Sequence, residues 1–132
     1  MRARLLSIFA LCGLASCATM SAPSNVSLTD AAANLTGLTA KVLPPANTVV
    51  SVHRNGGFGG KDLENAFAAA LRQRGFGVSD HTGTQVNYTA AQFDSAILLE
   101  IQTQNFVVMR AYQPDASGKL VPVSPLSMGE SN

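Results

Sequence analysis

The 132-residue sequence has few charged and few aromatic residues. Charged residues make up 13% of the chain, the formal net charge is +1, and there is no tryptophan. Nucleic-acid-binding proteins carry a clustered basic surface, so this composition argues against a nucleic-acid partner. The small number of aromatic residues predicts a modest hydrophobic core.

Motifs for metal binding and hydrolysis are also missing. The sequence has no H-E-x-x-H motif and no paired cysteines with zinc-binding spacing. His53 and His81 lie far apart in the sequence and are predicted to be surface residues, and Asp94 and Glu100 are separated by the expected start of a strand. We therefore expect no enzymatic activity, no cofactor, no metal and no small-molecule substrate.

A glycine-rich segment, residues 55–60, precedes Lys61 but departs from the phosphate-binding P-loop. The P-loop has a glycine five residues before its Gly-Lys pair, and a serine or threonine directly after the lysine. Asn55 and Asp62 occupy those two positions here. Residues 55–60 are therefore predicted to form a loop and not a nucleotide site.

The N-terminal residues have the pattern of an export signal. Arg2 and Arg4 precede a nearly unbroken apolar run, residues 5–14, which is shorter than the roughly 20 residues that a membrane-spanning helix needs. The run ends in Leu-Ala-Ser-Cys at residues 14–17, which resembles a bacterial lipobox. Residues 1–16 are predicted to be a signal peptide and Cys17 the lipidated residue. The alternative is an ordinary signal peptide with an incidental Cys17 thiol.

The expected anchor places the protein on a membrane surface. Two acyl chains already hold a protein stably on a membrane, and bacterial lipoproteins usually carry three. Ala18, and not an aspartate, follows Cys17; by resemblance to known sorting rules, this favours the periplasmic face of the outer membrane. Residues 17–27 carry no charge and are rich in serine, so they are predicted to form the lipidated end and a flexible tether.

A single folded domain is predicted to span residues 28–124. Apolar residues recur at helical spacing in residues 28–42, where either Ser27 or Thr29 is the candidate N-cap. A second helix, residues 61–74, is followed by Gly75 as a C-cap. Its apolar stripe consists of Leu63, Ala66, Phe67, Ala70 and Leu71.

The rest of the domain is predicted to be β-structure. The expected strands are 48–52, 77–79, 85–88, 96–102, 106–112 and 120–123. Gln104-Asn105 suits a tight turn, so the runs on either side of it should form a hairpin. The predicted fold class is α+β: an N-terminal helix, then strand–helix–strand and a β-meander, with the helices on one face of a small, mostly antiparallel sheet. Residues 125–132 are expected to form a loose tail.

One predicted strand is a candidate docking edge. Pro122 cannot donate a hydrogen bond to a strand ladder, so residues 120–123 should lie at the edge of the sheet. Exposed edges can pair with a strand of another protein. We therefore take Leu120, Val121 and Val123 as the candidate partner-docking edge.

Several short segments together carry a family resemblance. They are Pro44-Pro45-Ala46-Asn47-Thr48, Phe58-Gly59, Arg74-Gly75-Phe76, Tyr88, Arg110-Ala111-Tyr112 and Gly118-Lys119-Leu120-Val121-Pro122, besides the lipobox. In these segments the chain resembles the conjugal transfer lipoprotein family TrbH. The resemblance implies a structural or assembly role in a conjugative type IV secretion apparatus, with other envelope proteins of the channel as partners. The alternative is a free-standing outer-membrane lipoprotein that acts as a pilotin-like chaperone or a periplasmic binding module.

Overall fold

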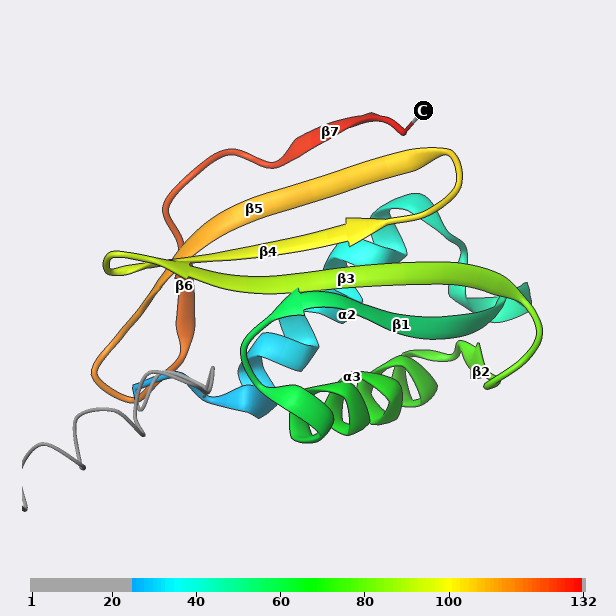
Figure 1. Ribbon diagram of the computed structural model, residues 1–132, viewed down its shortest axis with the longest axis horizontal. Coiled ribbons are helices and arrows are strands. Elements are labelled where there is room, and N and C mark those ends of the chain that lie inside the picture. The colour runs from blue at the N-terminus through cyan, green and yellow to red at the C-terminus, as the bar shows by residue number, and fades with distance from the viewer. Residues whose placement is uncertain (1–24, 132) are drawn as a thin grey trace, which may run out of the picture.

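The structure, a computed structural model, describes residues 25–131. The predicted signal peptide and Cys17 lie outside the described residues. Two α-helices cover one face of a seven-stranded sheet with the strand order β2-β1-β3-β4-β5-β6, and β7 also pairs with β5 (Figure 1). Two strand pairs are parallel and four are antiparallel. The predicted α+β class, with helices on one face of a mostly antiparallel sheet, is confirmed.

The elements follow one another in a simple order. They are α2 (Leu28–Val42), the 3-10 turn η2 (Pro45–Asn47), β1 (Val49–Gly57), α3 (Gly60–Arg74), β2 (Gly77–Val78), β3 (Thr84–Phe93), β4 (Ala96–Gln102), β5 (Phe106–Pro114), β6 (Leu120–Pro122) and β7 (Ser127–Glu130). The parallel pairs β1–β2 and β1–β3 are connected through α3, and β3 to β6 form the meander.

Helix α2 has the predicted bounds, and its start is tied to the rest of the fold. The Ser27 hydroxyl accepts a hydrogen bond from the Asp30 N–H at 3.2 Å, which makes Ser27, of the two candidates, the N-cap. Val26 is buried, and the Ser27 N–H donates to the Gly118 carbonyl oxygen at 3.1 Å. Val26 and Ser27, which the sequence places in the tether, are therefore packed against the domain.

Helix α3 confirms the second helix prediction, one residue earlier at its start. Leu63, Phe67 and Leu71 form its buried stripe. Gly75 ends the helix in the left-handed conformation at φ 109°, which glycine adopts without a steric penalty. The Phe76 N–H then donates to the Leu71 carbonyl oxygen at 3.0 Å, and the Phe76 side chain is buried.

Strand β1 is longer than the sequence predicts. Residues 55–57, expected to be loop, continue the strand because they pair in parallel with β3 across a bulge between Arg54 and Gly56. Gly57 has φ 104°, and a Cβ atom there would overlap the Ala90 carbonyl oxygen. The glycines thus permit a close approach between two strands, and the loop shrinks to the residues just before α3.

The two faces of the sheet differ in burial. The helix-covered face supplies the buried residues Val50, Val86, Tyr88, Ala90, Ile97, Leu99, Ile101, Val108 and Tyr112. Alternate positions on the same strands point to the opposite face because successive side chains in a strand alternate. No helix of the described chain covers that face, which is turned toward the viewer in Figure 1; we call it the open face.

The end of the chain differs from the expected loose tail. Ser127–Glu130 form β7, which pairs antiparallel with the first half of β5, while β6 pairs with the second half. The sequence Ser-Met-Gly-Glu has little intrinsic preference for strands. The unpaired edge of β5 provides the ladder that orders it.

Candidate functional site

The candidate docking edge is one interrupted strand, β6 followed by β7, along the outer side of β5. We call residues 120–130 the C-terminal edge. The interruption is at Ser124, whose hydroxyl accepts from the Ala111 N–H at 2.9 Å and whose carbonyl oxygen accepts from Arg110 Nε at 3.0 Å. The Ser124 side chain thus replaces a backbone partner, so the edge stays attached to β5 where the ladder breaks.

A tight turn leads into this edge. Asp115 Oδ1 accepts hydrogen bonds from the Ser117 N–H at 2.9 Å, the Ser117 hydroxyl at 2.7 Å and the Lys119 N–H at 3.1 Å. The hydrogen bonds from the side chain and backbone of Ser117 lower the pKa of the Asp115 carboxyl. Such a turn, in which an aspartate bonds backbone groups two residues on, fixes the direction in which β6 leaves β5.

Asp30 connects α2 to the same edge. Its Oδ2 atom accepts from the Leu120 N–H at 2.6 Å and from Asn34 Nδ2 at 3.2 Å. Leu120 is 90 residues further along the chain than Asp30, so the bond holds the start of β6 against the start of α2.

The three residues proposed for the docking edge do not share one environment. Leu120 is only 3% exposed, whereas Val121 and Val123 are 45% and 51% exposed. The register explains the difference: Leu120 pairs with Pro114 and lies on the helix-covered face, while Val121 pairs with Gln113 on the open face. Only Val121 and Val123 therefore offer side chains to another molecule.

The backbone of β6 has little capacity to pair with a further strand. The Val123 N–H points toward β5, where it donates to the Ala111 carbonyl oxygen at 2.9 Å. The N–H groups alternate in direction along a strand, so the backbone nitrogens of residues 120 and 122 face away from β5. The Leu120 N–H is bonded to Asp30, and Pro122 has no N–H. Such blocking is one way in which proteins protect a sheet edge.

Strand β7 is different. The Ser131 N–H donates to the Asn105 carbonyl oxygen at 2.9 Å, so the same alternation turns the N–H groups of Met128 and Glu130 outward. All four β7 residues are exposed. Sequence reasoning missed this part of the edge because nothing in the composition of β7 marks it as a strand.

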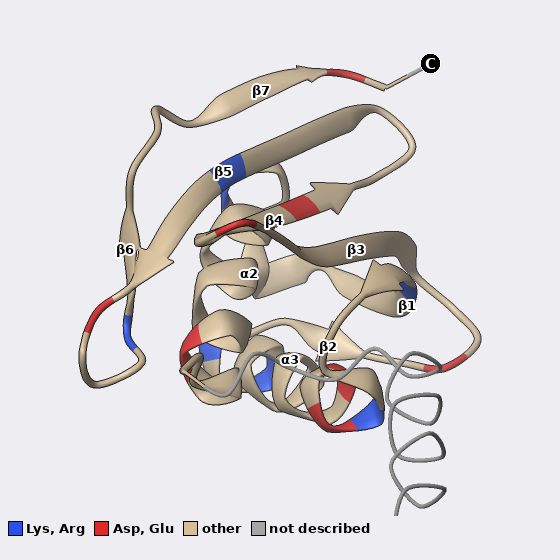
Figure 2. Ribbon diagram, turned by 60° about the vertical axis from the view of Figure 1, so that its left-hand side comes forward, with Lys and Arg blue, Asp and Glu red and all other residues tan. Residues whose placement is uncertain are grey.

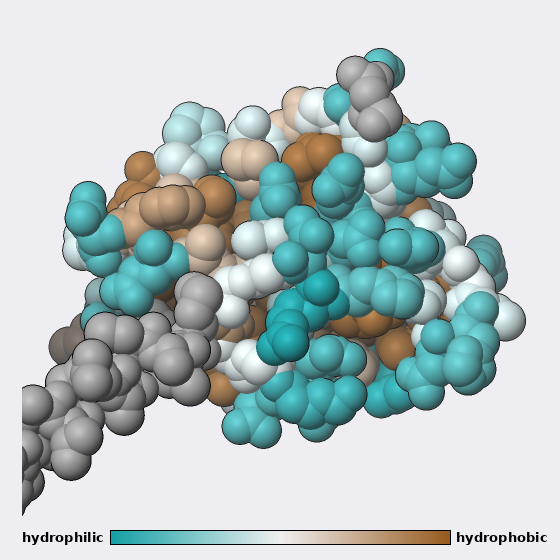
Figure 3. Space-filling model, in the orientation of Figure 1, coloured by the Kyte–Doolittle hydropathy of each residue, from teal (hydrophilic) through white to brown (hydrophobic). Residues whose placement is uncertain are grey.

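The open face is divided into a polar part and an apolar part. One open hollow of about 670 Å³ near the β4–β5 turn is lined by Gly83, Thr84, Gln85, Asn87, Gln102, Thr103, Gln104 and Ser131. None of these side chains is ionisable, so the hollow offers hydrogen bonds but no acid–base group. At the other end, apolar surface gathers between the β3–β4 turn and the segment that joins β6 to β7 (Figure 3).

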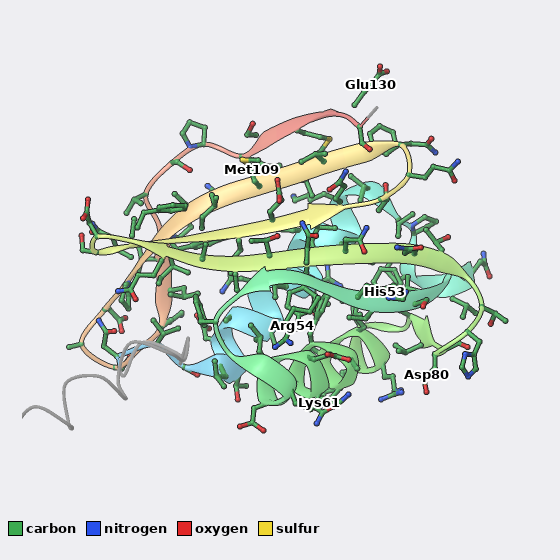
Figure 4. The ribbon with its side chains drawn as sticks, in the orientation of Figure 1. His53, Arg54, Lys61, Asp80, Met109 and Glu130 are labelled. Carbon is green, nitrogen blue, oxygen red and sulfur yellow. The ribbon has the colours of Figure 1, made fainter. Side chains whose placement is uncertain are left out.

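The residues considered for catalysis do not come together. His53 lies on the exposed side of β1 (Figure 4), where its Nε2 atom is 2.9 Å from the Ser51 hydroxyl oxygen. His81 is exposed in the loop before β3. Asp94 lies in the β3–β4 turn. Glu100 pairs with Met109 in the middle of β4, roughly 13 Å along the strand from its first residue, Ala96.

Charged residues are few in the described part of the chain. Charged residues concentrate on α3 and are sparse on the strands (Figure 2). Among residues 25–131, no group of three or more histidine, cysteine, aspartate or glutamate side chains is arranged to hold a metal ion. Within the same range, no helix is both long and apolar enough to cross a membrane.

The described residues thus form a two-layer α+β domain with one open sheet face and one exposed C-terminal edge. The family model described as conjugal transfer protein TrbH matches residues 15–132, nearly the whole chain. The chain therefore belongs to the TrbH family of conjugal transfer proteins, which confirms the resemblance seen in the sequence. No curated protein and no solved structure matches it.

Proposed function

We propose that this conjugal transfer protein is a lipoprotein of the bacterial envelope and a structural component of the conjugative type IV secretion apparatus. Its lipid is attached to Cys17 and anchors the chain on the periplasmic face of the outer membrane. The support for the anchor is the sequence alone: a basic start, an apolar run and the residues Leu-Ala-Ser-Cys at 14–17.

The protein acts by docking onto other envelope proteins of the channel through its C-terminal edge. The observation that carries this step is the exposure of Val121 and Val123 beside a strand, β7, with outward N–H groups. An extended segment of a partner can add to β7 by main-chain hydrogen bonds, while the two valines supply apolar contacts. Leu120 contributes from the core by holding β6 in place.

The anchor is tested by replacing its attachment point. Cys17→Ser removes the only thiol at the predicted lipobox, so we expect it to abolish incorporation of labelled palmitate and to leave an uncleaved or soluble chain. Labelling of the serine variant at the parental level would contradict the lipoprotein assignment.

The docking edge is tested with a matched pair of exposed valines. Val121 and Val49 are each 45% exposed, but Val49 lies on β1, away from the C-terminal edge. We expect Val121→Lys to reduce co-purification with channel subunits and the frequency of plasmid transfer, and Val49→Lys to leave both at the parental level. Both variants should unfold like the parent, because an exposed strand position tolerates a charge.

Two outcomes would contradict the proposal at different levels. Normal transfer by Val121→Lys excludes this edge as the docking surface. Normal transfer after deletion of the gene excludes the secretion-channel role itself and favours the free-standing lipoprotein. Leu120→Lys is not suitable for this test, since it places a charge in the core and is expected to unfold the domain.

A further inference from the structure

The described chain begins at the end of the molecule that holds the β3–β4 and β5–β6 turns. Asn25 lines one hollow of about 220 Å³ together with Gln92 and Ser95 of that hairpin. The blue beginning of the described chain and the β3–β4 turn lie at the same end of the molecule (Figure 1). The segment that connects the domain to Cys17 therefore leaves from this end.

The tip of the same hairpin presents an apolar side chain to solvent. Phe93 is 60% exposed, more than any other large hydrophobic residue of the described chain. It pairs with Ala96 across a tight turn in which Asp94 has φ 54°. Behind it on the open face lie Ala91 and Leu98, a directly opposed pair that is half-buried. The tip thus presents one exposed aromatic ring among polar side chains, with the Asp94 carboxylate at its apex.

The length of the connecting segment limits how far this tip can be from the lipid. Eight residue steps separate Cys17 from Asn25, and a fully extended chain covers at most about 3.6 Å per residue, or about 29 Å in all. The opposite end of the sheet, at Phe106, is separated from the tip by the ten-residue strand β3, or about 30 Å. A lipid on Cys17 therefore tethers the domain by the end of the molecule that carries the hairpin tip.

We infer that the β3–β4 hairpin tip, led by Phe93, rests in the lipid surface to which the chain is anchored. This inference rests on the proposed lipidation of Cys17. Phenylalanine is typical of the apolar face that interfacial segments bury at the headgroup boundary, and the Asp94 carboxylate at the turn fits the ammonium groups of a zwitterionic headgroup layer better than an anionic one. Val121 and Val123 lie two strands further along the sheet and remain free for a partner.

The absence of tryptophan from the chain allows a direct test. Phe93→Trp and Phe106→Trp each introduce a single indole, the first at the hairpin tip and the second at the opposite end, where Phe106 is 38% exposed. Each full-length lipidated variant is reconstituted into phosphatidylcholine–phosphatidylethanolamine vesicles, with and without brominated lipid, and acylation of Cys17 is verified by mass spectrometry.

We expect the Phe93→Trp emission to shift to the blue in vesicles and to be lost with brominated lipid, while the Phe106→Trp emission changes in neither respect. An acylated Phe93→Trp chain whose emission is insensitive to brominated lipid overturns this inference but leaves the proposed function standing. A blue shift without quenching has the same consequence, because it shows that protein, such as a second copy of the chain, covers the tip. A mature chain without acyl groups on Cys17 overturns the proposed anchor and this inference together.

Discussion

The ring of Phe67 in α3 meets the ring of Tyr88 in β3 edge-on, with centroids 5.3 Å apart and planes inclined at 72°. Both side chains are fully buried. Edge-to-face pairs of this kind contribute about 0.5–1.5 kcal/mol beyond the burial of their area. The contact joins the most regular helix to the strand that lies between β1 and β4, so it is central to the packing of the two layers.

Truncation of Phe67 tests how much its buried ring contributes to the free energy of unfolding. We expect Phe67→Ala to lower the free energy of unfolding by about 3–5 kcal/mol, because it removes a buried ring and leaves a cavity. Chemical denaturation of the soluble domain measures the change. Asn65→Ala, at an exposed position of the same helix, serves as the control and should stay within about 0.5 kcal/mol of the parent. Equal midpoints for the two variants would show that the ring does not pack as described.

Tyr88 makes the stability depend on alkaline pH. Its hydroxyl is buried and has no hydrogen-bond partner among the described residues. Burial, reinforced by Glu64 and opposed by Arg54, raises the pKa of Tyr88 from 10.0 to about 12. The folded state therefore favours the neutral phenol, and the unfolded state ionises first as the pH rises. The contribution to stability is complete below pH 10 and is lost on going to about pH 12.

The expected loss from Tyr88 over that range is about 3 kcal/mol, since each pKa unit corresponds to about 1.4 kcal/mol. Tyr88→Phe abolishes this component, and at neutral pH it should cost little because it removes an unpaired buried hydroxyl. Urea denaturation at about pH 9 and about pH 11, applied to the parent and the variant, measures the difference. Parallel decline of the two proteins would assign the alkaline loss to other groups.

Alanine substitutions at the two neighbouring glycines at the end of β1, Gly56 and Gly57, are expected to have different effects on stability. Gly57→Ala forces a side chain into a left-handed conformation and against the Ala90 carbonyl oxygen, so we expect a loss of more than about 3 kcal/mol. A Cβ at Gly56 meets nothing within 4 Å, so Gly56→Ala should change the stability by less than about 1 kcal/mol. Thermal unfolding distinguishes them, and equal stability would contradict the β1–β3 register.

Asp30 is expected to stabilise the domain more than an acidic residue in the first turn of a helix ordinarily does. Asp30→Ala removes both the bond to the Leu120 N–H and a charge in the first turn of α2, at a cost of about 1.5–3 kcal/mol. Asp62 occupies the first turn of α3 and is exposed, so Asp62→Ala loses only a helix-dipole interaction of about 0.3–1 kcal/mol. Hydrogen exchange at the Leu120 amide should accelerate in the Asp30 variant alone; unchanged exchange there would show that the bond is not formed.

The sequence predicted the local features of the fold well. The bounds of α2, the stripe of α3, the Gly75 cap and the β4–β5 hairpin each depend on residues within a few positions of one another. Spacing and capping residues record such interactions directly. For the candidate site, Pro122 correctly predicted that β6 lies at the edge of the sheet.

The tertiary structure decided the features that depend on distant partners. Gly57 continues β1 because Ala90 lies beside it, and β7 forms because the free side of β5 accepts it. Neither segment has the composition of a strand, so no local signal reveals the pairing. Phe93 likewise becomes notable only because the β3–β4 turn lies next to Asn25.

Composition and spacing in the sequence by themselves determined that the chain has an export signal pattern, two amphipathic helices and an edge strand at Pro122. Only the tertiary structure decided which side chains of that edge are available. A shift of one residue in strand register moves every side chain to the other face, and the pairing of Leu120 with Pro114 places Leu120 in the core. Val121 and Val123 face outward for the same reason. The Asp115 turn sets this register, and the hydrogen bond from the Leu120 N–H to Asp30, 90 residues earlier in the chain, holds it against α2.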